Sequence, residues 1–273
     1  MEKIKAAIAK VKSKNNNQTK NTDPTRKVGI KAQRVSRDIG SINYTNTKIV
    51  QLNPMQLENN RIITHHNHNP NASIFDSLRT QILQKMEDNN WQTIAVVSPT
   101  PESGKTLVSI NLAISIAKQP QKTVLLADFD LRKPKIASYL GVDVNKSLND
   151  YLDDKVKLED ALFNPGIQRM VVLPTMHSVT NASEKLASSK VSDLIEELKA
   201  RYESRIVIFD LPPILNVDDA MVLLPHVDCV LMVIANGVST EAEIEDALHL
   251  LPKENIVGIV YNMADSESKA YYY

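Results

Sequence analysis

Cysteine is nearly absent from this sequence of 273 residues: the only one, Cys229, lies in the apolar run 227–235. One thiol excludes an intrachain disulfide, a cysteine-rich metal site and an iron–sulfur cluster held by a pair of cysteines. A lone thiol in such a run is typical of a small core residue, and we expect a reducing, cytoplasmic location.

Long apolar runs are also missing. No stretch approaches the ~18–20 residues that a membrane-spanning helix requires, and the N-terminus lacks the apolar core of a signal peptide. We therefore expect that any attachment to a membrane depends on another molecule.

The formal net charge is zero, but the charges are unevenly distributed. Residues 1–72 hold 13 Lys/Arg against 4 Asp/Glu, a net of +9, and residues 73–273 hold 19 against 28, a net of −9. A basic arm on an acidic body indicates either a partner for the arm, such as an anionic lipid surface or an acidic protein face, or a solvated tail.

The arm contains twelve Asn and a single aromatic residue, Tyr44. Because such a segment buries little apolar surface, we expect residues 1–72 to be mostly disordered. Residues 44–57 are a possible short extended stretch. A cluster of histidines at positions 65, 66 and 68 has no other candidate ligands nearby, which favours a polar linker over a metal site.

Residues 1–14 are a second exception within the arm. Five apolar residues of this segment fall on one helical stripe, with five lysines around it. The pattern predicts either an interfacial or partner-binding helix or a frayed, solvated one. The stripe consists of Met1, Ile4, Ala7, Ile8 and Val11.

From residue 73 onward, apolar runs alternate with helical periodicity. Helices are expected at 105–118 and 191–202, and Thr240 with Glu243 forms a capping box that opens a helix through residue 251. Alternation of this kind predicts an α/β fold with a mostly parallel sheet covered by helices on both faces. The expected strands are 93–98, 123–128, 170–174, 205–210, 227–235 and 256–262.

Residues 98–106 read Ser-Pro-Thr-Pro-Glu-Ser-Gly-Lys-Thr and connect an apolar strand to a helix. This is the context of a phosphate-binding loop, in which backbone N–H groups and the helix N-terminus hold a phosphate. Lys105 would contact the β- and γ-phosphates and Thr106 would ligate Mg²⁺. The alternative is a plain strand–helix turn.

The loop is unusual because it has a single glycine. Glu102 occupies a position where a positive φ is often needed, and a carboxylate beside a triphosphate is unfavourable unless it points outward.

Two of the predicted strands end in aspartate. Asp128 ends one strand and is followed by Asp130, and Asp210 ends another strand. The carboxyl ends of parallel strands lie at one edge of a sheet, so we expect these carboxylates to meet the phosphate loop there. Carboxylate oxygens are hard ligands that suit Mg²⁺. A single aspartate at the end of a strand would more often cap a helix or a turn.

Residues 98–106, 124–132 and 206–213 resemble the Walker A, A′ and B motifs of bacterial tyrosine kinases (BY-kinases), relatives of the MinD/ParA ATPases. The nearest resemblance is to the separate-chain kinases of exopolysaccharide loci, which are chain-length-determinant proteins. Residues 57–61, 77–83 and 218–220 add to it, and it covers roughly residues 40–273. The three final residues, Tyr271, Tyr272 and Tyr273, are similar to the tyrosine cluster that these kinases phosphorylate.

The resemblance implies a role for each matching residue. The expected catalytic residues are Lys105, Asp128 and Asp130, with Asp128 as either the catalytic base or an acid that positions the metal. The expected metal ligands are Thr106, Asp130 and Asp210. The expected nucleotide-binding residues are Pro101, Glu102, Ser103, Gly104, Lys105, Thr106 and Leu107, with Asn262 against the adenine.

The resemblance further implies an ATP- and Mg²⁺-dependent protein-tyrosine autokinase that regulates exopolysaccharide synthesis, polymerisation and export. The expected partners are a membrane-embedded, Wzz-like polysaccharide co-polymerase that activates it, other copies of the chain and a tyrosine phosphatase, with no nucleic acid. The kinase would be cytoplasmic and recruited to the inner face of the plasma membrane. The expected parts are the arm 1–72, a kinase domain 73–265 and a tyrosine tail 266–273.

Two departures from the family pattern leave alternatives open. Glu102 replaces a glycine, and the oligomerisation motif Glu-x-x-Arg-x-x-Arg is reduced to Ser73, Asp76 and Arg79, so a ring-shaped assembly does not follow. One alternative is a ParA/MinD-type ATPase, although Thr100 stands where that group has a signature lysine. The other is a nucleotide-dependent adaptor with weakened catalysis.

Overall fold

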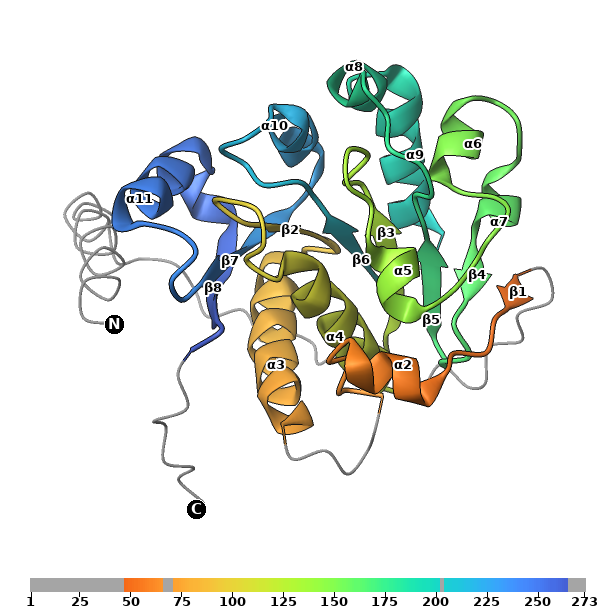
Figure 1. Cartoon of the computed structure of the whole chain (residues 1–273), viewed down its shortest axis with the longest axis horizontal. Coiled ribbons are helices and arrows are strands. Elements are labelled where there is room, and N and C mark those ends of the chain that lie inside the picture. The colour runs from red at the N-terminus through yellow and green to blue at the C-terminus, as the bar shows by residue number, and fades with distance from the viewer. Residues whose placement is uncertain (1–46, 66–70, 202–203, 265–273) are drawn as a thin grey trace, which may run out of the picture.

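A computed structural model describes residues 47–65, 71–201 and 204–264. Its centre is an eight-stranded sheet with the strand order β1-β4-β5-β3-β6-β2-β7-β8 (Figure 1). The strands are β1 (Lys48–Ile49), β2 (Thr93–Val97), β3 (Thr123–Asp128), β4 (Phe163–Asn164), β5 (Met170–Leu173), β6 (Arg205–Asp210), β7 (Cys229–Ala235) and β8 (Ile256–Asn262).

The central strands β2, β3, β6 and β7 are buried along their whole length. Their near-continuous Val, Ile and Leu content is what a parallel strand covered on both faces requires. All ladders of the sheet are parallel except the short pair β4–β5. The predicted fold class is therefore confirmed.

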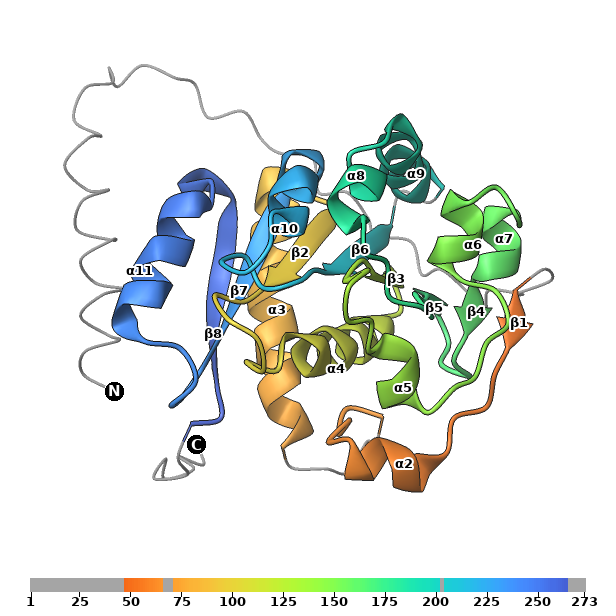
Figure 2. The same ribbon diagram turned by 45° about the horizontal axis from the view of Figure 1, so that its top comes forward.

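Helices cover both faces of the sheet (Figures 1 and 2). One apolar core joins the sheet to α2–α5, and a second joins the other face to α8–α11. The helices are α2 (Pro54–Asn59), α3 (Ala72–Asn89), α4 (Lys105–Ala117), α5 (Ile136–Leu140), α6 (Leu148–Leu152), α7 (Leu158–Ala161), α8 (Ala182–Leu186), α9 (Ser189–Ala200), α10 (Asp219–Leu223) and α11 (Glu241–Leu250), with short 3₁₀ turns η1 (Leu224–His226) and η2 (Lys253–Asn255).

The predicted strands and helices of the body are all present, with ends that differ by no more than two residues. The capping box of Thr240 and Glu243 is formed in both directions at the start of α11. Helix α3 was not predicted, because its polar residues give little helical periodicity.

The stretch 44–57 is only partly extended. Residues Lys48–Ile49 form β1, but the predicted extension to residue 57 is wrong, since Asn53 caps helix α2 and Pro54 occupies its first turn. Leu57 and Ile62 are fully buried against the body, although the sequence placed both in the arm. Residues 1–14 and His66 and His68 lie outside the described residues.

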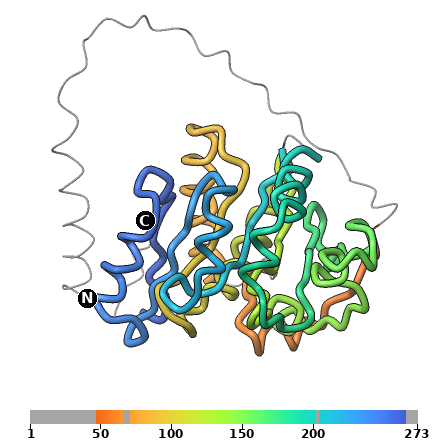
Figure 3. Tube along the Cα trace, turned by 90° about the horizontal axis from the view of Figure 1, so that it is seen from above, coloured from red at the N-terminus to blue at the C-terminus, as the bar shows by residue number. Residues whose placement is uncertain are grey.

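The sheet order separates the two ends of the described chain. β1 lies at one edge and β8 at the other, and Figure 3 shows the blue C-terminal elements and the green α6–α7 region at opposite ends of the molecule. The strands that carry the predicted motifs, β3, β6 and β2, are neighbours in the middle. None of the helices in the described ranges is long and apolar enough to span a bilayer.

Candidate active site

The loop between β2 and α4 is built on two left-handed residues. Glu102 has φ +64° and Gly104, the N-cap of α4, has φ +82°. The expectation of a positive φ at position 102 is confirmed. The Glu102 side chain is exposed, as the electrostatic argument required.

Gly104 is required by a close approach as well as by its φ. A Cβ at this position would lie 2.3 Å from Nδ2 of Asn262, which is closer than two such atoms can approach. The same Nδ2 donates a hydrogen bond to the Ser103 carbonyl at 3.0 Å. Asn262, at the end of β8, therefore holds the loop backbone; its contact with adenine remains a prediction.

Hydroxyl groups fix the rest of the loop. Ser98 and Ser103 both donate to the Thr100 carbonyl, at 2.8 and 3.0 Å. The Thr100 hydroxyl lies 2.7 Å from the hydroxyl of Ser239, which precedes α11. The loop is thus attached to β8 on one side and to the start of α11 on the other.

The start of α4 meets the two acidic strand ends. The Lys105 ammonium donates to Asp130 at 3.0 Å, and the Thr106 hydroxyl donates to Asp210 at 2.6 Å. Ser109, one turn further along α4, donates to the other oxygen of Asp210 at 3.1 Å. The predicted meeting of loop and carboxylates at one edge of the sheet is confirmed.

Asp128 is fully buried and lies opposite Asp210 in the β3–β6 ladder. Its Oδ2 accepts the backbone N–H groups of Lys135 and Ile136, at 3.0 and 2.9 Å. Its Oδ1 accepts only a longer bond of 3.3 Å from the Asp130 backbone. Asp128 therefore positions the loop after β3 with one oxygen and keeps acceptor capacity on the other.

Burial and mutual repulsion set the protonation of this cluster. Burial raises the pKa of the Asp128 carboxyl well above its usual range, and the Asp210 charge raises it further. Burial also raises the pKa of Asp210, against the opposing effects of Lys105 and Thr106. For Lys105, burial favours a lower pKa, but the charges of Asp210 and Asp130 outweigh it and raise the pKa.

The donor set fits Mg²⁺ bound together with a nucleotide. No three His, Cys, Asp or Glu side chains within the described ranges form a metal site by themselves. Mg²⁺ normally takes one or two protein oxygens and completes its shell with phosphate oxygens and water. Thr106 and Asp210, which are 2.6 Å apart, would supply such oxygens.

The other predicted site residues are placed as follows. Pro101 is exposed at the tip of the loop, Ser103 is buried beneath it, and Leu107 is half-buried on the first turn of α4. The phosphorylation sites Tyr271, Tyr272 and Tyr273 lie outside the described residues, and their role remains a prediction.

Sequence reasoning missed three groups that the structure brings to this edge. Ser109 is four residues after Lys105, so the helical repeat would have placed it on the same face. No local sequence pattern marks Ser239 as part of the site. Arg132 forms a bidentate pair with the buried Asp219 at 2.7 and 3.0 Å, and Ser183 also donates to Asp219.

The degraded oligomerisation motif lies on α3. The Arg79 guanidinium bonds to Asp76 at 2.9 Å and to the Ser115 carbonyl of α4 at 3.2 Å, and Ser115 donates to Asp76. These contacts are all within one chain, so Arg79 joins α3 to α4.

Comparison with known proteins agrees with this geometry. The model of an AAA domain family matches residues 91–251. Tyrosine-protein kinase YwqD of Bacillus subtilis is 31% identical over 194 residues, which cover 70% of this chain and 81% of YwqD. EpsB of Ralstonia nicotianae is 32% identical over 206 residues, 75% of this chain but only 27% of EpsB. The chain thus spans about a quarter of the length of some curated relatives.

A solved structure gives the same result. The kinase domain of the Escherichia coli tyrosine kinase ETK superposes with a TM-score of 0.69 and 30% identity, covering 78% of this chain and 84% of that domain.

Proposed function

Because this chain belongs to the bacterial tyrosine-protein kinase family, we propose that it transfers the γ-phosphoryl group of ATP to tyrosine side chains, including those of its own kind. The observation that carries the proposal is the convergence of Lys105, Thr106 and three strand-end carboxylates at the carboxyl edge of β2, β3 and β6. This arrangement offers a cation and a helix N-terminus to phosphates beside acceptors for a proton.

The nucleotide would bind with its phosphates in the loop 98–104. Lys105 would then exchange Asp130 for the β- and γ-phosphates, because it now lies 3.0 Å from that carboxylate. Asn262 and Ser239 hold the loop from two sides and would keep its backbone N–H groups directed at the phosphates. When bound, Mg²⁺ would neutralise phosphate charge, held through Thr106 and Asp210 with Asp130 nearby.

In the transfer step, the phenolic oxygen bonds to the γ-phosphorus, the bond from that phosphorus to the bridging oxygen breaks, and ADP leaves. The phenolic proton passes to Oδ1 of Asp128, the less occupied of its two oxygens. Burial raises the pKa of Asp128, so that its carboxylate, once ionised, is a stronger base than an exposed aspartate.

We propose a polysaccharide-locus role for the kinase. Its substrates would be Tyr271, Tyr272 and Tyr273, and its setting the synthesis and export of an exopolysaccharide at the inner face of the plasma membrane. A membrane-embedded, Wzz-like co-polymerase would recruit and activate it, and a tyrosine phosphatase would reset it. Support comes from the tyrosine-protein kinases to which the chain is similar and from the three carboxylates that can accept a proton at the site.

The test is incubation of the purified chain with γ-labelled ATP and Mg²⁺, followed by phosphoamino-acid analysis. Label on tyrosine supports the proposal. Hydrolysis of ATP without label on protein contradicts it and favours a ParA/MinD-type ATPase, whereas nucleotide binding without turnover favours an adaptor.

Lys105→Met is the matched control. The unbranched methionine side chain can occupy the place of Lys105, which is 12% exposed, and Asp130 keeps the Lys133 backbone N–H, so the fold is expected to survive. Tyrosine label should fall by about 10²-fold or more, because a preorganised charge at the transferred group is lost. An unchanged label in this variant would rule out the assignment of the phosphate loop.

A further inference from the structure

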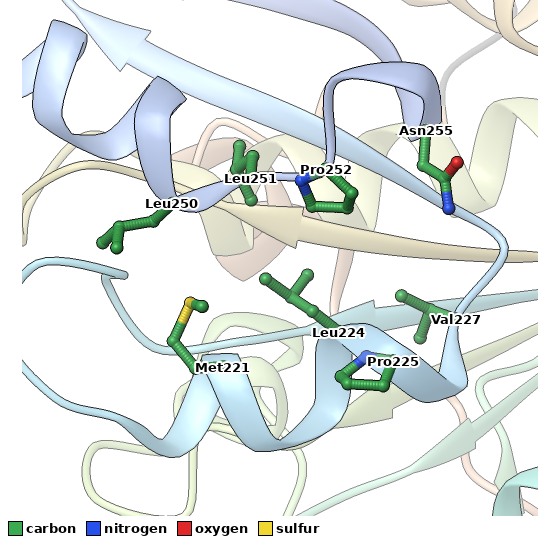
Figure 4. Close-up of a pocket in the computed structure, with 8 residues that line it drawn as sticks. All are labelled: Met221, Leu224, Pro225, Val227, Leu250, Leu251, Pro252 and Asn255. Carbon is green, nitrogen blue, oxygen red and sulfur yellow. The ribbon is translucent and has the colours of Figure 1, made fainter.

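An apolar groove lies far from the catalytic edge. It has a volume of about 450 Å³ and separates α10 and η1 from the end of α11. Figure 4 shows Met221 and Leu224 on one wall and Leu250, Leu251 and Pro252 on the other. Leu250 is 43% exposed, so its side chain is accessible to an occupant of the groove.

The groove is at the amino edge of the sheet. One of its lining residues, Val227, lies two residues before β7, and another, Asn255, directly precedes β8. The nucleotide loop is at the opposite, carboxyl edge, a strand length of about 23 Å away for seven residues. The groove is therefore separate from the site described above.

The segment that supplies the second wall of the groove is acidic, although the residues that line the groove are not charged. Residues 241–255, which form α11 and η2, contain five acidic residues and one lysine, a net of −4. Asp246 is exposed one turn before Leu250 on the same side of α11. An occupant with an apolar stripe flanked by positive charge would match both features.

We propose that residues 1–14 of the same chain dock in this groove. The segment carries the apolar stripe Met1, Ile4, Ala7, Ile8 and Val11, and its five lysines and one glutamate give a net of +4. Ile4 and Ile8, one helical turn apart, would enter between Leu224 and Leu250. The lysines on either side would face the acidic residues of α11.

The connecting chain is long enough for docking within one molecule. The described chain starts at the β1 edge, seven strand spacings or about 34 Å from β8. Residues 15–46 span up to about 106 Å when extended, and a polar chain of that length has a root-mean-square span of about 30 Å. Because this root-mean-square span is close to the distance between the two sheet edges, the effective concentration of residues 1–14 at the groove would be near its maximum, of millimolar order.

The tyrosine tail is a poorer occupant. It leaves β8 at the carboxyl edge, and residues 265–273 contain two acidic residues and one lysine, a net of −1. Like charge would oppose its approach to α11.

Cysteine cross-linking tests the proposal in the full chain. Ser13→Cys and Glu254→Cys place one thiol at the end of the segment and one on the exposed rim of the groove, and a short bismaleimide would join them. The native Cys229 is fully buried and its pKa is raised to about 12, so it will not compete. The reference pair, Ser13→Cys with Ile49→Cys, uses an exposed site on the opposite sheet edge.

We expect an intrachain cross-link well above that of the reference pair. Adding Leu250→Glu should lower the docked fraction by about tenfold, since the burial of an aliphatic side chain is replaced by a charge. The matched change Ile74→Glu, at an exposed isoleucine on α3, should leave it unchanged. Raising salt from about 0.1 to 1 M should also weaken the cross-link, because the Debye length falls from about 10 to 3 Å.

Three results would overturn the proposal. One is a cross-link no stronger than that of the reference pair. If the chain then also co-sediments with phosphatidylserine vesicles, the segment binds lipid and not the groove. Another is cross-linking only between chains. The third is an equal effect of Leu250→Glu and Ile74→Glu.

Discussion

At the scale of single residues, the buried carboxyls of Asp128 and Asp210 make the stability of the protein depend on pH. Both carboxyls are fully buried, they face each other across the β3–β6 ladder, and burial raises the pKa of each. A raised pKa means that the folded protein holds protons which the unfolded chain has released. The contribution of these two carboxyls to stability is therefore greatest below the ordinary carboxyl pKa and is lost as the pH rises through the raised values.

Asp128→Asn should separate catalysis from stability. The amide oxygen can still accept the N–H groups of Lys135 and Ile136, so the fold and ATP binding should persist. Without a proton acceptor, tyrosine phosphorylation should fall by about 10²–10⁴-fold. Urea unfolding at several pH values should show that stability falls less than in the wild type as the pH rises above the ordinary carboxyl pKa.

Asp130→Asn serves as the comparison, because it keeps the buried pair intact. Wild-type phosphorylation in Asp128→Asn would mean that another group takes the phenolic proton. A stability profile as steep as that of the wild type would mean that Asp128 does not titrate in this range.

Glu102→Gly tests the second unusual residue. Glycine adopts φ +64° without strain and removes an exposed negative charge beside the phosphates. We expect ATP to bind about threefold more tightly, with the gain reduced in high salt. Glu102→Gln separates the two causes, since it removes the charge and keeps the side chain. Weaker binding of ATP, measured by calorimetry, would show that the carboxylate assists the nucleotide.

At the scale of elements, the packing of α3 on α4 depends on one polar network. Asp76, Arg79 and the buried Ser115 bond to one another across the two helices. Ser115→Ala should lower the free energy of unfolding by about 1–2 kcal/mol, because Asp76 loses a buried donor. The control Gln81→Ala changes an exposed residue of α3 and should have little effect.

A double-mutant cycle completes this test. If Asp76 and Ser115 interact as the structure shows, the effects of Asp76→Ala and Ser115→Ala will be non-additive by about 0.5–3 kcal/mol. Additive losses would mean that the two side chains act independently.

The sequence predicted those elements whose signal is local. Buried strands such as β6 read as continuous apolar runs, and the capping box at Thr240 marked the start of α11. The strand-end aspartates could be placed together because parallel strands share one carboxyl edge. The contacts between Thr100 and Ser239 and between Ser103 and Asn262 join residues 139 and 159 positions apart, so only the tertiary fold reveals them.

At the scale of the whole molecule, we predict that phosphorylation occurs between chains. Residues 264–273 extend at most ~33–36 Å, and they leave β8 at the crowded edge that holds the active site. A neighbouring site is easier to enter than the chain's own. Each phosphate would add about −1.5 to −2 charges, so a phosphorylated tail would be repelled by the acidic body, whose net charge is −9.

Mixing two defective chains measures this directly. One carries Asp128→Asn and an intact tail, and the other is active but lacks residues 271–273. Phosphotyrosine should appear on the inactive, full-length chain. If that chain gains no label while the wild type labels normally, the tail must reach its own site.

The strand order also has a consequence for the order in which the molecule opens. β3, β6 and β2, which hold the phosphate loop and carboxylates, are interior strands, whereas β1 and β8 are edge strands that each have one neighbour among the described residues. Edge strands open first in sub-global fluctuations. The amides of β3 and β6 should therefore exchange with deuterium only through global unfolding. The amides of β8 should exchange through a local opening of lower free energy. This opening breaks the hydrogen bond between Asn262 and Ser103, so the phosphate loop loosens while the rest of the sheet stays intact.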